Sequence, residues 1–212
     1  MTERPTDLPA LLCSRLCHDL LSPVGAMNNG IELLVDEKDP DMRARCIELL
    51  ADSARAAADK LKFFRLAFGA AGGFGEEIDP NEAKEAISSL VTGSGRTQLE
   101  WAVPAQHLPK AAVKVMLNLI YIANESLVRG GTLAVGAERR EGTTEIVVRG
   151  EGPKLVMDEA VRRTLEGRMS ADQVDSRTAA AWMVTDLAAR NGGGVQIAMD
   201  ESAIVIGAVC NS

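Results

Sequence analysis

The first third of the chain carries a long helical pattern of apolar residues. They recur at steps of three and four positions, at Leu12, Leu16, Leu20, Val24, Met27, Ile31 and Leu34. This period predicts one amphipathic helix over residues 8–35 with a single buried stripe. A short polar turn over residues 36–41 follows, and Pro40 suits the first turn of a second helix that ends near position 68.

The turn between the two predicted helices is so short that they must pack as an antiparallel hairpin. The second helix has an apolar seam of its own, formed by Cys46, Leu50, Ala57, Leu61, Phe64 and Phe68. A lone hairpin about 40 Å long, at 1.5 Å per residue, cannot cover both apolar seams. We therefore expect a homodimer in which two hairpins form a four-helix bundle.

A glycine-rich stretch over residues 69–75 separates this pattern from a different one. We take it as the boundary between a helical domain, residues 1–70, and a second domain, residues 76–212. In the second domain, helices are predicted over residues 79–91, 109–127, 158–166 and 177–190, and strands over 97–103, 132–138, 143–149, 195–199 and 203–209. The expected fold class is therefore α+β, a helical hairpin followed by an α/β sandwich.

One of the two histidines, His18, lies within the first helical pattern. At about 100° per residue it lies about 160° from the apolar stripe, so its imidazole is expected to face solvent. An imidazole is partly neutral near physiological pH and is nucleophilic without strong activation. The neighbouring Asp19 could hold one ring nitrogen and leave the other free, which favours a nucleophilic role.

Two other roles for His18 stay open on position alone. The first is an ordinary solvated side chain on the outer face of an amphipathic helix. The second is a metal site with Cys13 and Cys17, but this set is one ligand short of the usual four, and both thiols lie about 100–140° away around the helix. The other histidine, His107, lies in a predicted loop without partners and is assigned no role.

Composition narrows the class of protein. Hydrophobic residues make up 46% of the 212 positions, enough for a packed core, and no apolar run approaches the ~20 residues that span a bilayer. A net charge of −7 with only 3% aromatic residues argues against nucleic-acid binding. The four cysteines lack the spacing of an extracellular disulfide framework, and the N-terminus lacks a secretion signal. We therefore expect a soluble, cytoplasmic protein with reduced thiols.

The segment His18-Asp19-Leu20-Leu21-Ser22-Pro23 resembles the histidine box of sensor histidine kinases, in which an acid, a Ser or Thr and a Pro follow the phosphoacceptor histidine. The predicted hairpin resembles their dimerisation and histidine-phosphotransfer domain. The order of elements in the second domain resembles their ATP-binding domain, the Bergerat fold. This resemblance covers nearly the whole chain and implies that His18 is the phosphoacceptor.

The ATP-binding motifs of that family are incomplete in this chain. Ile122 stands where the second Asn of the N-box holds Mg²⁺, and an isoleucine offers no oxygen ligand. Val148 replaces the Asp that reads the adenine amino group. Ser176, Thr178 and Ala180 occupy glycine positions of the lid, where side chains would crowd a triphosphate. The resemblance therefore implies a degenerate Bergerat-type domain that binds neither ATP nor another cofactor.

An intact histidine box beside a disabled ATP-binding domain resembles the ChpT-type histidine phosphotransferases of bacterial phosphorelays. This resemblance implies a homodimer that accepts a phosphoryl group on His18 from the receiver domain of a hybrid histidine kinase. The group then passes to response regulators, CtrA-like and CpdR-like in the best-known case. Mg²⁺ is expected to come with the partner receiver domain, so this chain needs no metal ligand. Two alternatives stay open: an ATP-dependent soluble histidine kinase, and a non-catalytic dimeric scaffold that binds a regulator.

Within this interpretation Asp19 is expected to orient or deprotonate His18. Ser22, one turn further along, is expected to hydrogen-bond a phosphoryl oxygen or a water of the attacking group. A Ser ahead of Pro23 equally often bonds the carbonyl of its own helix, so this role stays open.

The surface around His18 is expected to dock the receiver domain, and the second domain is expected to complete that surface. Arg15 and Lys60 could offset phosphate charge, although a solvated helix face explains both equally well. Gly25 and the nearby asparagines have poor helix propensity, which indicates that something other than helix stability favours them. The expected partner-binding residues are Arg15, Leu21, Gly25, Asn28, Asn29 and Glu32.

Overall fold

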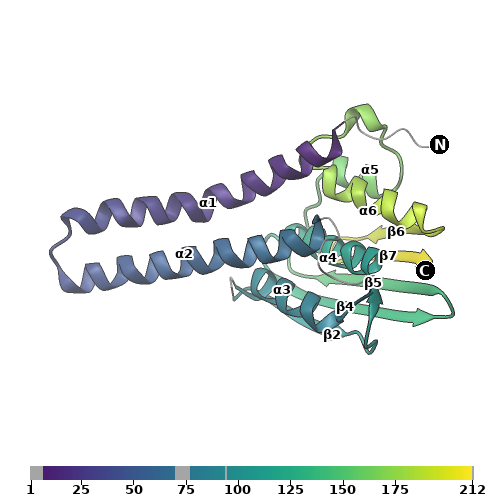
Figure 1. The fold of residues 1–212 in the computed structure, drawn as a ribbon, viewed down its shortest axis with the longest axis horizontal. Helices are drawn as coiled ribbons and strands as arrows, with labels where there is room; N and C mark the ends of the chain where they lie inside the picture. The colour runs from purple at the N-terminus through teal and green to yellow at the C-terminus, as the bar shows by residue number, and fades with distance from the viewer. Residues whose placement is uncertain (1–6, 70–76, 94, 212) are drawn as a thin grey trace.

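The computed structural model describes residues 7–69, 77–93 and 95–211. Two long helices come first, α1 (Leu8–Asp36) and α2 (Pro40–Ala67). They form an antiparallel hairpin whose far half extends well beyond the rest of the molecule (Figure 1). The predicted hairpin is confirmed.

A five-stranded mixed sheet forms the centre of the second domain. Its strands follow one another across the sheet as β2 (Thr97–Ala102), β4 (Gly131–Arg140), β5 (Thr143–Glu151), β7 (Ala203–Asn211) and β6 (Gly194–Met199). β2 and β4 are parallel, and the other neighbours are antiparallel. Each of these strands lies within two residues of the predicted bounds, so the expected α+β class is confirmed.

Helices cover one face of the sheet (Figure 1). They are α3 (Pro80–Thr92), α4 (Lys110–Ser126), α5 (Glu159–Leu165) and α6 (Ala179–Arg190). Three short elements were not predicted, because two or three residues carry no periodic pattern. They are β1 (Glu77–Ile78), β3 (Leu108–Pro109), which pairs with β1, and the 3₁₀ turn η1 (Ala171–Gln173).

Local sequence determines where several elements begin and turn. Four helices begin at an aspartate whose carboxylate accepts a hydrogen bond from a backbone N–H of the first turn, namely Asp7, Asp39, Asp79 and Asp158. The antiparallel strands β4 and β5 are joined by a turn at Glu141 and Gly142, with φ of 31° and 83°. Positive φ at both central residues matches the twist of the two strands.

Within the single chain, the face of α1 that packs against the rest of the molecule differs from the predicted apolar stripe. The buried residues of this helix are Asp19, Pro23 and Gly30, whereas Val24 and Ile31 are 42% and 54% exposed in the single chain. At about 100° per residue, the packed face is rotated by about 60° from the apolar stripe. Small side chains decide the rotation, because they allow the two helices to approach closely.

Gly30 shows how close this approach is. A Cβ atom added there would lie 3.0 Å from Cδ2 of Leu50 on α2. On α2 itself, Cys46, Ala57 and Phe64 are buried as predicted, but Leu61 is 50% exposed. Each helix of the hairpin therefore keeps an apolar face that this chain does not cover.

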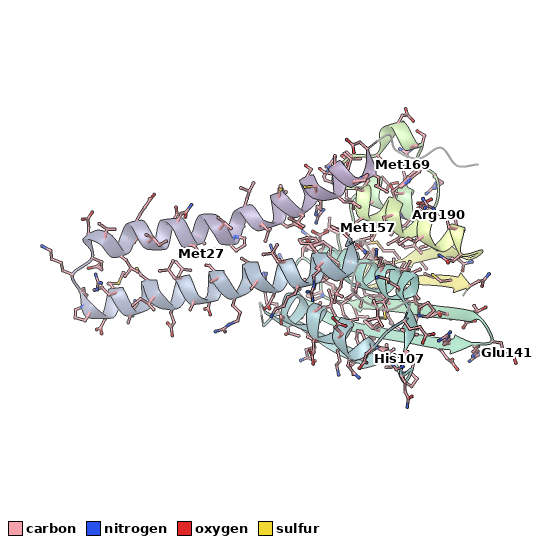
Figure 2. All side chains as sticks on the ribbon, in the orientation of Figure 1. Met27, His107, Glu141, Met157, Met169 and Arg190 are labelled. Atoms are coloured by element: carbon pink, nitrogen blue, oxygen red, sulfur yellow. The ribbon has the colours of Figure 1, made fainter. Side chains whose placement is uncertain are left out.

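The far half of the hairpin carries side chains on all sides (Figure 2), and its near half shares the core of the second domain. Phe63 and Phe64 of α2 belong to the same cluster of buried residues as the inner face of the sheet. Of the predicted glycine-rich boundary, only Gly69 lies within the described residues, so the domain division stays a prediction. Among the residues that the structure describes, no helix is both long and apolar enough to cross a bilayer.

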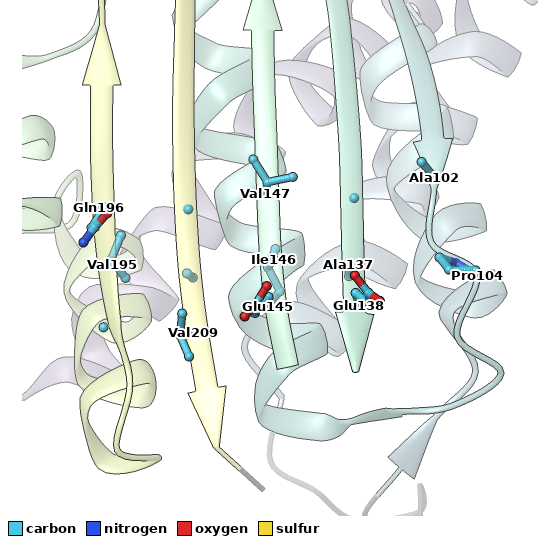
Figure 3. A pocket seen from close by; sticks show the side chains of 14 residues that line it. Ala102, Pro104, Ala137, Glu138, Glu145, Ile146, Val147, Val195, Gln196 and Val209 are labelled. Atoms are coloured by element: carbon cyan, nitrogen blue, oxygen red, sulfur yellow. The ribbon is translucent and has the colours of Figure 1, made fainter. Parts of the chain in front are cut away.

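The other face of the sheet is open. Val147 and Val209 are 45% and 38% exposed there, and Glu138 pairs directly across the strands with Glu145 (Figure 3). Two like charges placed opposite each other are unfavourable. Arg140 offsets them, because its Nη2 donates to Glu138 at 2.7 Å and lowers the pKa of that carboxyl.

All four cysteines carry free thiols. Cys13 and Cys17 are exposed, whereas Cys46 and Cys210 are buried. Burial raises the pKa of Cys210 to about 11, so this thiol is protonated and unreactive at neutral pH.

Candidate functional site

His18 projects from α1 with 81% of its side chain exposed, as the helical pattern predicted. Its Nδ1 lies 3.1 Å from Oδ1 of Asp19. An ionised carboxylate only accepts hydrogen bonds, so Nδ1 carries the proton and donates it. In the neutral ring, Nε2 then carries the lone pair, on a side chain that is largely open to solvent. This is the arrangement that a nucleophilic imidazole needs.

Asp19 is 9% exposed and lies where α1 meets α4. Its Oδ2 accepts a hydrogen bond from the Tyr121 hydroxyl at 2.5 Å and another from Nε of Arg15 at 3.1 Å. Burial raises the pKa of Asp19, but the hydrogen bonds from Tyr121 and His18 and the charge of Arg15 outweigh it. The net pKa therefore lies below the ordinary value of 3.8, and the carboxylate stays ionised at neutral pH.

Arg15 extends this network to a second residue of α4. Its side chain is 14% exposed, and its guanidinium pairs with the carboxylate of Glu125 and donates to the Tyr121 hydroxyl at 3.3 Å. It also lies 5.4 Å from the centre of the Tyr121 ring, close enough for a cation–π contact. The structure thus contradicts the expectation that Arg15 faces a partner, because its guanidinium is committed to Asp19 and α4.

One face of α4 contacts both helices of the hairpin. Lys114, Asn118, Tyr121 and Glu125 recur at helical spacing and so lie on one side. Lys114 donates to the Gly69 carbonyl and Asn118 to that of Ala67, which satisfies carbonyls at the end of α2. Tyr121 and Glu125 contact α1 instead. Neither residue was expected in the site from the sequence, although four polar positions at helical spacing on an apolar helix were the available signal.

Pro23 leaves one backbone carbonyl of α1 available to Lys60 of α2. Proline has no N–H, so the carbonyl four residues earlier, that of Asp19, loses its helical partner. The Lys60 ammonium donates to this carbonyl at 2.6 Å. Figure 1 shows that α1 is bent along its length, as an internal proline causes. One residue of the histidine box thereby fixes a cation of α2 at the backbone of Asp19.

A groove of about 680 Å³ lies between the hairpin and α3, one turn along from His18. Ser22 lines it with its side chain exposed, and among the described residues its hydroxyl makes no hydrogen bond. It is therefore available to an incoming group. The groove is lined further by Ala26 of α1, by Arg55 and Lys60 of α2, and by Ser89 and Leu90 of α3.

The other expected docking residues share the outer face of α1 with His18. Leu21 is 68% exposed, and Asn28, Asn29 and Glu32 are exposed as well. Gly25 has no atom within 4 Å of the place where a Cβ would stand. The structure therefore brings Leu21, Ser22, Gly25, Asn28, Asn29 and Glu32 into one open surface, which we call the docking face.

The positions that diverge from the kinase motifs lie apart from this surface. Ile122 and Val148 are 5% and 0% exposed and belong to the hydrophobic core. Ala180 is buried and Ser176 half-buried. The Thr178 hydroxyl lies 3.0 Å from a carboxylate oxygen of Asp175, which closes a turn ahead of α6. Within the described residues, no group of three or more His, Cys, Asp or Glu side chains could hold a metal ion.

Comparisons with known proteins identify relatives of nearly the whole chain. Residues 80–203 match the family described as histidine phosphotransferase C-terminal domain. The sequence is 36% identical over 208 residues to the protein phosphotransferase ChpT of Brucella abortus (strain 2308), covering 98% of each chain. The structure matches a 1.7 Å structure of a bacterial phosphotransferase with a TM-score of 0.85 and 33% identity over 98% of both chains.

Proposed function

Because the chain belongs to the histidine phosphotransferase family, we propose that it relays phosphoryl groups between receiver domains through a phosphohistidine at His18. One observation carries this proposal: His18 is exposed, and the ionised carboxylate of Asp19 holds its Nδ1. The neighbouring residue thus fixes the ring, while Nε2 is open to a partner.

In the proposed transfer, His18 is the one group of this chain that forms or breaks a covalent bond. The Nε2 lone pair attacks the phosphorus of an aspartyl phosphate in line, an N–P bond forms, and the P–O bond to the receiver carboxylate breaks. The ring becomes positively charged and keeps its Nδ1 proton, and Asp19 stabilises that charge. In the second transfer an aspartate of another receiver attacks, and the N–P bond breaks.

Ser22 and Lys60 are proposed to stabilise the phosphoryl group. The Ser22 hydroxyl makes no hydrogen bond within the described part of the chain and lies one turn from His18, so it can donate to a phosphoryl oxygen. The Lys60 ammonium has two N–H groups beyond the one that it gives to the Asp19 carbonyl. Mg²⁺ bound by the receiver domain would neutralise further charge on the transferred group, and this chain is proposed to supply no metal ligand.

We propose that the chain binds no ATP. The buried apolar side chains of Ile122 and Val148 and the closed turn at Thr178 support this proposal. The phosphoryl group then comes from a partner, for which we propose the receiver domain of a hybrid histidine kinase. The proposed acceptors are response regulators, CtrA-like and CpdR-like by the resemblance stated above, which would place the protein in the cytoplasm.

The receiver domain is proposed to dock on the docking face and in the adjoining groove. Both adjoin His18, and α3 forms one wall of the groove. A helix of the receiver laid in this groove would contact the hairpin and the second domain together. This agrees with the expectation that the second domain completes the docking surface.

A labelling experiment tests the proposed relay. When the protein is mixed with a phosphorylated receiver domain, His18 should acquire a phosphate that is labile in acid and stable in alkali. His18→Ala should abolish the label. Because the side chain is exposed, this change should alter the free energy of unfolding by less than about 0.5 kcal/mol. Circular dichroism and thermal unfolding check that the variant stays folded.

Two results would decide for the alternatives. Labelling of His18 by ATP alone would identify an ATP-dependent histidine kinase. Absence of label across a panel of receiver domains, with biological activity preserved in His18→Ala, would identify a non-catalytic scaffold.

A further inference from the structure

The carboxylate that holds His18 is itself held by the second domain. Oδ1 of Asp19 lies 3.1 Å from His18 Nδ1, and Oδ2 accepts a hydrogen bond from the Tyr121 hydroxyl at 2.5 Å. We propose that Tyr121 is a positioning residue for phosphoryl transfer, which acts by fixing Asp19 and thereby the tautomer and orientation of the His18 ring. This inference rests on the proposed function of His18.

The geometry of α1 explains why Asp19 needs such support. Consecutive residues of a helix point about 100° apart, so the buried Asp19 must turn one oxygen back toward the exposed His18. Arg15, one turn earlier, binds only the other oxygen. The Tyr121 hydroxyl and Arg15 together occupy Oδ2, which leaves Oδ1 for the imidazole. Without the hydroxyl, Oδ2 keeps only its hydrogen bond from Arg15, and the carboxylate rotates more easily about its terminal torsion.

The Tyr121 hydroxyl has a fixed direction. It accepts from Nη2 of Arg15 at 3.3 Å and donates its own proton to Asp19. The ring is packed against Phe63 and Phe64, with centres 5.1 and 6.1 Å away. Burial raises the pKa of Tyr121 far above neutral, so the hydroxyl remains a donor. The support for Asp19 is therefore rigid.

The same helix carries the position where histidine kinases place a metal ligand. Ile122 fills that position and is buried in the core, whereas Tyr121, about 100° away around α4, faces α1. In this chain α4 thus contributes to the histidine site through a direct contact and without a nucleotide. This gives the second domain a role in the chemistry as well as in docking.

Tyr121→Phe tests the inference because it removes the hydroxyl and keeps the ring. The rate of phosphoryl transfer at saturating receiver should fall about 10- to 100-fold, the effect of one hydrogen bond to a charged group. The affinity for the receiver domain should stay unchanged. In ¹⁵N NMR, the wild-type His18 ring should be protonated mainly at Nδ1, and the variant should show a mixture of both tautomers. The pKa of Asp19 should rise, because one of its hydrogen-bond donors is lost.

Lys114→Met is the matched control. Lys114 lies on the same face of α4 and also contacts the hairpin, but at Gly69. This change should leave the transfer rate and the tautomer of His18 as they are in the wild type. If both variants slow transfer equally, the contact of α4 with the hairpin has only a structural role, and the inference is wrong.

A second variant separates a direct effect of Tyr121 from one through Asp19. In the background Asp19→Asn, the further change Tyr121→Phe should slow transfer less than twofold, and a full additional loss would overturn the inference. Wild-type protein that takes no label contradicts the proposed function itself. Labelled wild type with a Tyr121→Phe variant of equal rate and tautomer contradicts only the role of Tyr121.

Discussion

His18 and Asp19 are neighbours in the sequence, yet one side chain is exposed and the other is buried. The helical turn of about 100° per residue causes this difference, because the two residues fall on either side of the line where α1 meets solvent. The imidazole can therefore react with a partner while its supporting carboxylate stays protected. An exposed imidazole beside a buried carboxylate suits the proposed transfer of a phosphoryl group between large partner proteins.

Replacing either of two glycines of α1 by alanine is expected to change the stability of the protein differently. Gly25 lies on the docking face with no atom within 4 Å of an added Cβ, whereas at Gly30 the Cβ would lie 3.0 Å from Leu50. Since glycine costs about 0.5–1 kcal/mol in a helix interior, Gly25→Ala should stabilise the protein by about that amount. Gly30→Ala should gain less or destabilise, because the hairpin must open slightly. Thermal or urea unfolding measures both.

The variants Gly25→Ala and Gly30→Ala also test whether Gly25 belongs to the surface that binds a receiver domain. If the proposed surface is right, Gly25→Ala should weaken binding of a receiver domain although it stabilises the fold. A stabilised variant with unchanged receiver affinity would exclude Gly25 from that surface. Gly30→Ala serves as the comparison, since Gly30 is buried against α2.

At the scale of elements, α1 depends on Pro23 for more than its bend. The proline leaves the Asp19 carbonyl without a helical N–H, and Lys60 of α2 takes that place. Two helices therefore hold the histidine box. Lys60 of α2 bonds the backbone carbonyl of Asp19, and Tyr121 of α4 bonds the Asp19 side chain. Both contacts lie between elements that are distant in the sequence.

A double-mutant cycle between Pro23 and Lys60 tests this coupling. Lys60→Met keeps the apolar stem of the side chain but leaves the Asp19 carbonyl unpaired, which should cost about 1–2 kcal/mol of stability. In Pro23→Ala the new N–H can bond that carbonyl, so Lys60→Met should then cost little. A coupling energy of about 1 kcal/mol is expected from urea unfolding. Equal costs in both backgrounds would show that Lys60 does not replace the missing helical bond.

At the scale of the whole molecule, the hairpin leaves two apolar stripes uncovered. On α2 the exposed stripe consists of Ile47, Ala51, Ala54, Ala58 and Leu61 at helical spacing. On α1 it includes Val24, Ile31 and Val35, the last of which is 77% exposed. We propose that a second copy covers both stripes, so that two hairpins form a four-helix bundle with a His18 on each side. The small alanines of α2 would allow close approach at the centre.

Ala54→Arg should separate the dimer into monomers, because a long charged side chain would stand in the middle of that interface. Ala56→Arg is the matched control, since position 56 lies about 160° away on the same helix. Light scattering after size-exclusion chromatography should give 22.5 kDa for Ala54→Arg and twice that mass for the wild type and for Ala56→Arg. A dimeric Ala54→Arg variant would contradict this interface.

The sequence alone determined the features that depend on near neighbours. The helices begin at aspartates, β4 and β5 turn at Glu141-Gly142, and His18 faces solvent, because caps, turn residues and helical spacing act over a few positions. The motif around His18 also indicated the family, which the comparisons confirm.

Only the tertiary structure decided which side of α1 is buried and what holds Asp19. Hydrophobic spacing did not show which side of α1 packs against α2, because the small size of Gly30 determines how the hairpin packs. Tyr121 lies 102 positions from Asp19, and no periodic pattern connects them. Their contact depends on how α1, α2 and α4 cross, which the shapes of many packed side chains determine together. The exposed histidine of the box can be predicted from the sequence, whereas the contacts that hold its neighbour Asp19 are a property of the folded chain.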